Sequence, residues 1–211
     1  MADLKNVLFL MTRHGETILN EADKFRGWSN GPDARLTDLG IKQARQAGKF
    51  IERLPVEVSC IVSSDLDRAQ HSAAIIAGIL GIDKIYVDKR LRPLNVGSLA
   101  GKVKAETPID EYIKNPTKSF PDGESIQDFD RRQAEFADRL MELIQMFPGK
   151  VPLVQCHVSN IMYQENLHKP SDEYLDEKSD LVGPGGVVAA TAETVIPLLK
   201  ENKHIEEHHE K

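Results

Sequence analysis

Several common functional signatures are missing from this chain of 211 residues. It has only two cysteines, Cys60 and Cys156, which form no CxxC pair. Both lie in β-branched apolar stretches typical of buried strands, so the sequence predicts neither a disulfide framework nor a cysteine metal site. HExxH, GxxxxGK[ST] and GxGxxG are absent, which excludes the usual zinc, P-loop and dinucleotide sites. We therefore expect no metal and no cofactor, and we interpret His204, His208 and His209 of the tail as at most an adventitious metal binder.

Long hydrophobic runs and an excess of positive charge are also missing. The apolar segment 7–11 is too short for a membrane span or a signal-peptide core, so we expect no membrane association and a cytoplasmic location. The formal net charge is −6, whereas binding to the nucleic-acid backbone draws on many lysines and arginines over one face. We expect no nucleic-acid partner, and an anion would have to bind in a local pocket.

Length and composition favour one domain. With 40% hydrophobic side chains, the chain is long enough to bury a full core. We expect a single domain over residues 1–200 and a charged, disordered tail over 201–211. Segment 102–123 is rich in Lys, Pro and polar residues, which predicts an irregular excursion with one helical turn at 110–113, a candidate lid or insertion.

Apolar periodicity predicts that strands and helices alternate along the chain. The expected strands and helices are as follows: strands over 6–12, 58–62, 85–87 and 151–156, one or two edge strands within 187–199, and helices over 36–54, 65–80 and 124–147. Thr37 and Ser64 are the expected N-caps, and Gly81 is expected to end the second helix. Continuously apolar strands are typical of a parallel sheet covered on both faces. The predicted fold class is therefore α/β, a mostly parallel central sheet flanked by helices in a three-layer sandwich.

Two arginines and two histidines follow the expected strands at their carboxyl ends. Arg13 and His14 follow the first strand, Arg68 comes shortly after the second, and His157 follows the fourth. In open parallel sheets ligands bind at these ends, so the four side chains should converge. Guanidinium and imidazole groups suit a phosphoryl group, and a neutral His14 has a free lone pair with which to attack it. Gly15 would let a backbone amide approach closely, and a cation such as Arg68 in the first turn of a helix opposes the helix dipole and favours a bound anion.

Two nearby residues have a simpler interpretation. Cys156 and His157 are neighbours on a strand and point to opposite faces, so they do not form a nucleophile–base pair. We expect Cys156 to lie in the core, and we interpret His71, within the alanine-rich helix, as structural.

Over residues 7–161 the sequence resembles the histidine phosphatase (phosphoglycerate mutase-like) superfamily. The matching motifs are RHGET at 13–17, FRGW at 25–28, LTDLGIKQA at 36–44, SDLDRA at 64–69, DGESIQDFDRR at 122–132, and His157 as the second family histidine, here followed by Val158 instead of Gly. The resemblance implies a phosphohistidine on His14, with Arg13, Arg68 and His157 stabilising the phosphoryl group. It also implies that Asn20 binds substrate.

One departure from the family pattern concerns the general acid. The resemblance places a proton-donating Glu in the segment that reads LRPLNVGSLAG here, and Pro93 occupies its position. Proline cannot donate a proton, and the amide of Asn95 does not titrate. Glu16, Asp122 and Glu124 are the candidates for a relocated acid, and the sequence does not choose among them.

These features predict a phosphatase that hydrolyses a small phosphorylated metabolite through phosphohistidine. A phosphoglycerate mutase-type phosphotransferase and a non-catalytic phospho-ligand binder (pseudophosphatase) are the alternatives, the second supported by Pro93. The substrate and the oligomeric state stay open. Four lysines of the excursion are interpreted either as lining the mouth of the pocket or as ordinary solvated residues, namely Lys102, Lys104, Lys114 and Lys118.

Overall fold

A six-stranded sheet forms the centre of the computed structural model, which describes residues 4, 6–166, 183–191 and 195–199. The strands are β1 (Phe9–Arg13), β2 (Val58–Ser63), β3 (Ile85–Val87), β4 (Val151–Cys156), β5 (Val187–Ala190) and β6 (Val195–Leu199). They lie in the order β3-β2-β4-β1-β5-β6. The first four are mutually parallel, whereas β5 is antiparallel to both β1 and β6.

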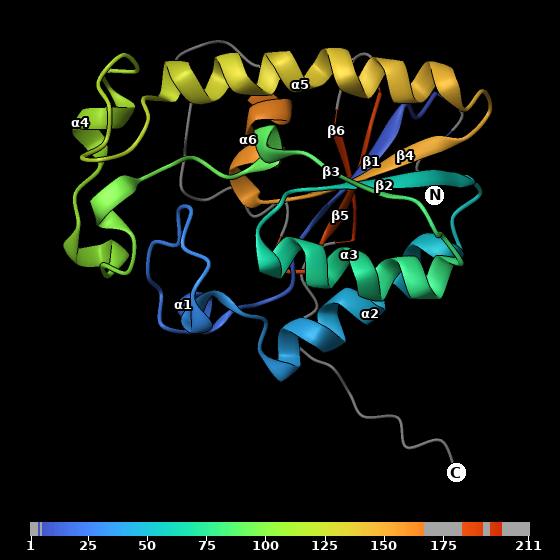
Figure 1. The fold of residues 1–211 in the computed structure, drawn as a ribbon, viewed down its shortest axis with the longest axis horizontal. Helices are drawn as coiled ribbons and strands as arrows, with labels where there is room; N and C mark the ends of the chain where they lie inside the picture. Colours follow the sequence, from blue (N-terminus) through green and yellow to red (C-terminus); the bar gives the residue numbers. More distant parts are fainter. Residues whose placement is uncertain (1–3, 5, 167–182, 192–194, 200–211) are drawn as a thin grey trace.

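Helices cover both faces of the sheet (Figure 1). Alternate residues of β1 show which helices cover each face. Leu10 packs in one apolar cluster with residues of α2 (Asp38–Glu52) and α3 (Asp67–Leu80). Phe9 and Met11 pack in another cluster with residues of α5 (Ile126–Met146) and α6 (Val158–Asn166). The predicted three-layer α/β fold is confirmed.

The ends of the helices test the predicted caps. Thr37 caps α2, since its Oγ1 accepts a hydrogen bond from the Gly40 amide at 3.0 Å. Gly81 ends α3 with φ of +65°, a left-handed conformation that glycine adopts without strain. The prediction for Ser64 was wrong, because Leu66 is the N-cap and the Ser64 hydroxyl accepts instead from the Leu66 amide at 3.4 Å.

The other boundaries shift slightly from the expected ones. Helix α5 begins at Ile126 and not at Glu124, because Ser125 and Asp128 form a capping box there. The segment 187–199 holds two strands, of which β6 lies at the edge and β5 lies between β1 and β6. Residues 201–211 and the metal-binding interpretation of the tail lie outside the described residues.

Short helices and 3₁₀ turns lie in the loops that follow the carboxyl ends of the parallel strands. They are α1 (Ile18–Glu21), α4 (Asp110–Ile113) and the 3₁₀ turns Pro32–Ala34, Lys89–Leu91, Gly97–Leu99 and Lys104–Glu106. The excursion at 102–123 is irregular and carries one helical turn, α4, at the predicted place. Its neighbourhood has a small apolar cluster of its own, built on Val96, Leu99, Tyr112 and Phe120. No helix within the described ranges is long and apolar enough to cross a bilayer.

Candidate active site

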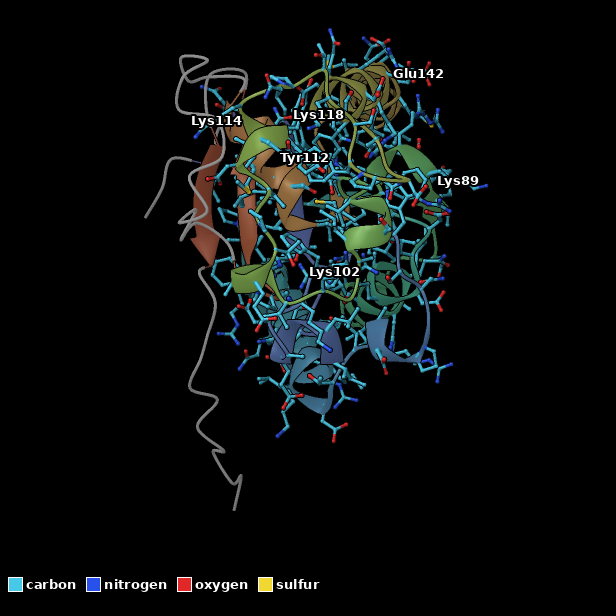
Figure 2. The ribbon with its side chains drawn as sticks, turned by 90° about the vertical axis from the view of Figure 1, so that its left-hand side faces the viewer. Lys89, Lys102, Tyr112, Lys114, Lys118 and Glu142 are labelled. Carbon is cyan, nitrogen blue, oxygen red and sulfur yellow. The ribbon has the colours of Figure 1, made fainter. Side chains whose placement is uncertain are left out.

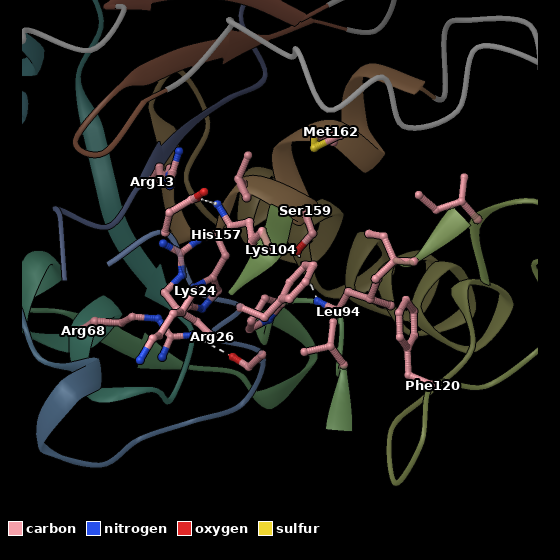
Figure 3. A pocket seen from close by; sticks show the side chains of 18 of the residues that line it. Arg13, Lys24, Arg26, Arg68, Leu94, Lys104, Phe120, His157, Ser159 and Met162 are labelled. Atoms are coloured by element: carbon pink, nitrogen blue, oxygen red, sulfur yellow. Dashed lines mark hydrogen bonds and ion pairs between the residues drawn. The ribbon is translucent and has the colours of Figure 1, made fainter. Parts of the chain in front are cut away.

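A cavity of about 530 Å³ opens where the parallel strands end. Arg13, Arg68 and His157 line it, from the end of β1, the first turn of α3 and the residue after β4. His14 lies fully buried beside them, with its ring centroid 5.0 Å from that of His157. The four side chains that the sequence predicted to converge therefore do so, and Figure 3 shows three of them, Arg13, Arg68 and His157.

The ring of His14 is oriented by the backbone. Its Nδ1 lies 2.7 Å from the Gly15 carbonyl oxygen. A carbonyl oxygen only accepts, so the hydrogen is on Nδ1 and the lone pair is on Nε2. Nε2 has no hydrogen-bond partner among the described residues. Burial, and then the nearby charges of His157, Arg68, Arg26 and Arg13, lower the pKa of His14 well below its ordinary 6.5. The imidazole is neutral at neutral pH and has a free lone pair.

Gly15 has a different structural role from the one expected. A Cβ at this position would lie 2.1 Å from the Gly40 carbonyl oxygen. The Gly15 amide donates to the Ser72 hydroxyl at 3.2 Å. Glycine is therefore required here for the close packing of the loop on α2, which holds the His14 backbone in place.

The guanidinium of Arg68 is held by two backbone oxygens. Nη1 donates to the Ser29 carbonyl at 2.7 Å and Nη2 to the Gly27 carbonyl at 2.9 Å. Nε has no partner within the described part of the chain. Burial lowers the pKa of Arg68 to about 10, so the side chain stays charged at neutral pH. The guanidinium is thus a fixed cation whose carbonyl partners only partly satisfy its donors.

His157 is positioned by a polar network. Its backbone amide donates to Oδ1 of Asn160 at 3.1 Å, and Asn160 Nδ2 donates to Oε1 of Gln133 at 2.9 Å. Neither ring nitrogen of His157 has a partner in the described ranges. Burial and then the charge of Arg68 are the main causes that lower its pKa well below 6.5. Helix α6 begins directly after this residue, so its N-terminal end faces the cavity and favours an anion there.

Arg26 is a cavity residue to which sequence reasoning gave no role. It lines the cavity, and its Nη1 is buried without a hydrogen-bond partner among the described residues. Burial and the charges of Arg13 and Arg68 lower its pKa well below 12.5, while Asp23 raises it. The sequence feature that could have indicated a role for Arg26 is its position as the cation of the FRGW motif. It precedes Gly27, whose carbonyl accepts a hydrogen bond from Arg68.

Asn20 lies in a helix cap and is not among the lining residues of the cavity. Its Oδ1 accepts from the backbone amide of Thr17 at 3.1 Å and from the Thr17 hydroxyl at 2.9 Å, which closes the capping box of α1. The contact of Asn20 with substrate stays a prediction. Because Oδ1 already accepts two hydrogen bonds, the side-chain Nδ2 would have to donate to the substrate.

Pro93 lines the cavity, and none of the three candidate acids does. Glu16 accepts from the Thr37 hydroxyl at 2.9 Å, away from the cavity. Glu124 pairs with Arg132 at 2.6 Å. Asp122 is exposed in a left-handed turn with φ of +58°.

Among the described residues that line the cavity, only Asp23 carries a carboxyl group. Its Oδ1 accepts from Nζ of Lys104 at 2.7 Å, and both side chains are exposed. Of the four lysines of the excursion, only Lys104 lines the cavity. Lys118 pairs with Glu111, and Figure 2 shows it with Lys102 and Lys114 spread over the outer surface.

A comparison of the sequence with known protein families identifies one that contains all four of these site residues. The profile of the histidine phosphatase superfamily (branch 1) matches residues 9–174, most of the described chain. The chain belongs to the histidine phosphatase superfamily. This confirms the resemblance seen in the motifs, and the match includes His14, Arg13, Arg68 and His157.

The proteins that this chain is similar to are named for different activities. "Probable phosphoglycerate mutase GpmB" of Yersinia pestis (strain Pestoides F) is 35% identical over 154 residues, which cover 70% of this chain and 67% of the relative. A phosphoglycerate mutase from Thermus thermophilus is 23% identical, with a TM-score of 0.66 over 92% of this chain and 99% of that one. A mycobacterial glucosyl-3-phosphoglycerate phosphatase is 21% identical, with a TM-score of 0.71 over 91% and 97% of the two chains. At these identities the two structures show the fold alone.

No group of three or more His, Cys, Asp or Glu side chains in the described residues could hold a metal ion. Cys156 is fully buried and its thiol pKa is raised by burial, as expected of a core residue. His71 is exposed on α3.

Proposed function

We propose that the protein hydrolyses a small phosphate monoester by transferring its phosphoryl group first to His14 and then to water. The observation that carries this proposal is the His14 ring: its Nδ1–H is held by a backbone oxygen, and its free Nε2 lies beside a cluster of cations. A neutral imidazole with a fixed lone pair is a competent nucleophile.

The reaction balances in two steps. In the first, Nε2 of His14 forms a bond to phosphorus, the ester P–O bond breaks and the organic oxygen leaves. In the second, a water oxygen attacks phosphorus and the P–N bond breaks, which releases phosphate and restores the neutral imidazole. One proton of the water ends on the leaving alcohol.

Arg13, Arg26 and Arg68 are the groups that would hold the phosphoryl oxygens. Phosphoryl transfer is accelerated mainly by positioning and by fixed positive charge around those oxygens. The unpartnered Nη1 of Arg26 and Nε of Arg68, together with the ring of His157, offer donors that no described residue satisfies. A phosphoryl group would satisfy buried donors that otherwise cost free energy.

A second candidate, a non-catalytic phospho-ligand binder, has one specific observation in its favour. Pro93 lies at the cavity where the family pattern has an acid, and none of the candidate carboxyls joins it there. A mutase has the names of relatives in its favour, but it must also protect phosphohistidine from water and rebind its intermediate.

The test is a panel of phosphate esters assayed for phosphate release with wild type, His14→Ala and the exposed control His71→Ala. We expect aryl phosphates to be hydrolysed by wild type and by His71→Ala, but not by His14→Ala. Labelled substrate quenched without acid should place the label on His14 as acid-labile, base-stable phosphohistidine.

The same panel separates the alternatives. Label on Ser or Asp in an active enzyme would overturn the mechanism. Anion binding with every ester inert would favour the non-catalytic binder. Phosphoryl transfer between the positions of a phosphoglycerate without phosphate release would favour the mutase.

A further inference from the structure

The cavity has two chemically distinct halves (Figure 3). Arg13, Arg26, Arg68 and His157 gather at one end. Leu94 and Phe120 lie away from these cations (Figure 3), and Val96 and Ile109 pack in the same apolar cluster as Phe120. Ile113 and Met162 add apolar side chains to the lining. A ligand with its phosphoryl group at the cationic end would therefore place its organic group against hydrocarbon.

The apolar side of the cavity, called the wall below, is supported by a cluster of buried side chains. Val96 and Phe120 are almost fully buried in the cluster that also contains Tyr112, and the Tyr112 ring stacks on Phe120 with centroids 4.4 Å apart. Ile109 also packs on this cluster. Packing of this kind fixes the positions of these side chains beside the cavity.

The wall is also tied to the loop that carries Arg26. The Phe25 amide donates to the Lys102 carbonyl at 3.0 Å, and the Gly101 amide donates to the Phe25 carbonyl at 2.7 Å. Lys24 and Val103 form a β-bridge beside them. These bonds join the loop that carries Arg26 to the segment between Val96 and Ile109, so the two halves of the cavity are connected through hydrogen-bonded backbone.

Among the described residues, most side chains at the apolar end carry no hydrogen-bonding group. Ser159 lines the cavity and its hydroxyl accepts from the Leu94 amide at 3.2 Å, which leaves its single O–H donor for a ligand. The lining side chains of Asp23 and Lys104 pair with each other at 2.7 Å. A buried ligand hydroxyl without a partner loses affinity by roughly ten-fold or more. A sugar or glycerate carbon chain, with a hydroxyl on nearly every carbon, fits this surface poorly.

We propose that the physiological substrate is a phosphomonoester whose organic group is a hydrocarbon, aromatic or aliphatic, that lies against the wall formed by Leu94, Ile113, Phe120 and Met162. The proposal rests on the phosphatase function proposed above. It agrees with Pro93, because an aryl oxygen leaves without needing a proton.

The test uses alkylphosphonates, which cannot be hydrolysed, so binding is measured whether or not the protein turns over. Calorimetric titration of the full chain with ethyl-, butyl- and hexylphosphonate should show the dissociation constant falling about 3- to 4-fold per added methylene. A 6-carbon phosphonate with hydroxyls along its chain should bind at least ten-fold more weakly than hexylphosphonate. An affinity independent of chain length, or equal affinity for the hydroxylated compound, would overturn the proposal.

Substitutions of wall residues test whether the alkyl chain of the phosphonate binds at this surface. Met162→Gln has nearly the same shape but a polar end, and it should weaken hexylphosphonate several-fold while leaving orthophosphate affinity unchanged. Ile113→Thr repeats the test from α4. The matched control Met146→Gln changes a residue that is 54% exposed and not among the cavity-lining residues, so it should change neither affinity. Unchanged hexylphosphonate binding in both wall variants would contradict the assignment, and intact orthophosphate binding shows that a variant is folded.

Turnover separates the two proposals. In a series of 4-alkylphenyl phosphates, which share nearly the same leaving oxygen, kcat/KM should rise with alkyl length. Hydrolysis without this rise overturns the substrate class and leaves the phosphatase standing. A chain-length effect in phosphonate binding with every ester inert supports the hydrocarbon site and overturns the phosphatase alone.

Discussion

The hydrogen bonds around Arg68 hold its guanidinium in a fixed position in the proposed anion site. The Ser29 and Gly27 carbonyls hold its terminal nitrogens, and its Nε is buried without a partner among the described residues. A guanidinium fixed in this way loses little freedom when an anion binds. Its position therefore matters as much as its charge.

Replacing Arg68 should weaken anion binding. A charged hydrogen bond contributes about 1.5–3 kcal/mol, so Arg68→Ala should reduce vanadate affinity roughly ten-fold or more. Arg68→Lys should fall between wild type and Arg68→Ala, because an ammonium cannot span both carbonyls. Competition titration with vanadate measures the change. The control Arg131→Ala removes an arginine that is 67% exposed and should leave the affinity unchanged, and unchanged affinity in Arg68→Ala itself would exclude this anion site.

Pro93 leads to a prediction about leaving groups. General-acid catalysis typically contributes about 10²–10⁴ in rate, so wild type should cleave aryl phosphates faster than alkyl phosphates by a factor of that order. Pro93→Glu should narrow the gap by accelerating alkyl esters, provided that the loop tolerates it. Rates with matched aryl and alkyl phosphates measure this effect.

Efficient alkyl hydrolysis by wild type, with a rate that falls as the pH rises, would contradict that prediction, because a general acid works only while it is protonated. Asp23 is then the first residue to replace, because it carries the one carboxyl among the described cavity-lining residues. Asp23→Asn should slow alkyl hydrolysis and leave aryl hydrolysis nearly unchanged, whereas Asp122→Asn, which changes an exposed turn residue, should change neither rate.

At the scale of elements, the segment that carries Pro93 and Leu94 is held by one arginine of α5. Arg132 pairs with Glu124 at 2.6 Å, with side-chain exposures of 16% and 13%. It also donates to the carbonyls of residues 90, 92 and 93. Glu124 in turn accepts from the Asn95 amide at 2.8 Å. One ion pair thus joins the start of α5 to the cavity wall.

Breaking this ion pair should affect both stability and catalysis. Removing one partner of a largely buried pair leaves the other unpaired, so Arg132→Ala should lower the free energy of unfolding by about 2–4 kcal/mol. It should also lower kcat/KM for aryl phosphates, because the wall loses its support. Urea unfolding and steady-state kinetics measure the two effects. Arg131→Ala breaks an exposed pair on the same helix and should cost under about 1 kcal/mol. Equal losses in the two variants would contradict the assigned role.

Much of the element order could be predicted because each element's own residues encode it. The β1 strand reads as continuously apolar since it is covered on both faces, and Thr37 and Gly81 act within their own turns. The cap at Ser64 was missed because Leu66 accommodates the extended backbone without a side-chain bond.

The site was predictable only in part. The strand ends placed Arg13, His14, Arg68 and His157 together, since parallel topology brings these ends to one edge. The FRGW motif marks Arg26 as a cation of interest, but its place in the cavity depends on how the loop 23–28 lies against the start of α3, and the motif does not give that arrangement. The apolar wall likewise depends on contacts between segments far apart in the sequence.

At the scale of the whole molecule, a chain with a formal net charge of −6 gathers several cations and two histidines in one cavity. The histidines are buried neutral, and like charges nearby oppose their protonation. Burial of the surrounding core offsets the free energy that this arrangement costs. An anion that enters the cavity would relieve the repulsion.

Stability should therefore decrease in acid. Because His14 and His157 have folded pKa values well below 6.5, the unfolded chain binds more protons than the folded chain below that pH. The free energy of unfolding should fall by up to about 1.4 kcal/mol per pH unit for each histidine as the pH drops below about 6.5. Urea unfolding at pH 7.5 and 5.5 measures the difference.

Variants and ligand identify the source of this acid sensitivity. His157→Gln should remove part of the pH dependence, whereas His71→Gln, which changes an exposed residue, should leave it in place. Added phosphate should reduce the loss at pH 5.5, because a bound anion favours the protonated rings. A pH dependence that persists unchanged in both His14→Gln and His157→Gln would contradict the assignment.

The position of β4 also has a consequence for biosynthesis. This strand is the fourth along the chain, yet it lies between β1 and β2 and pairs with both. A nascent chain that has emerged only as far as residue 150 has both strands but not the one that joins them, so their edges are open to pairing with other chains. Such a long-range insertion is slow and leaves an aggregation-prone intermediate on the ribosome. His157 follows β4 directly, so the residues synthesised from 151 onward supply both the strand that joins β1 to β2 and the second histidine of the anion site.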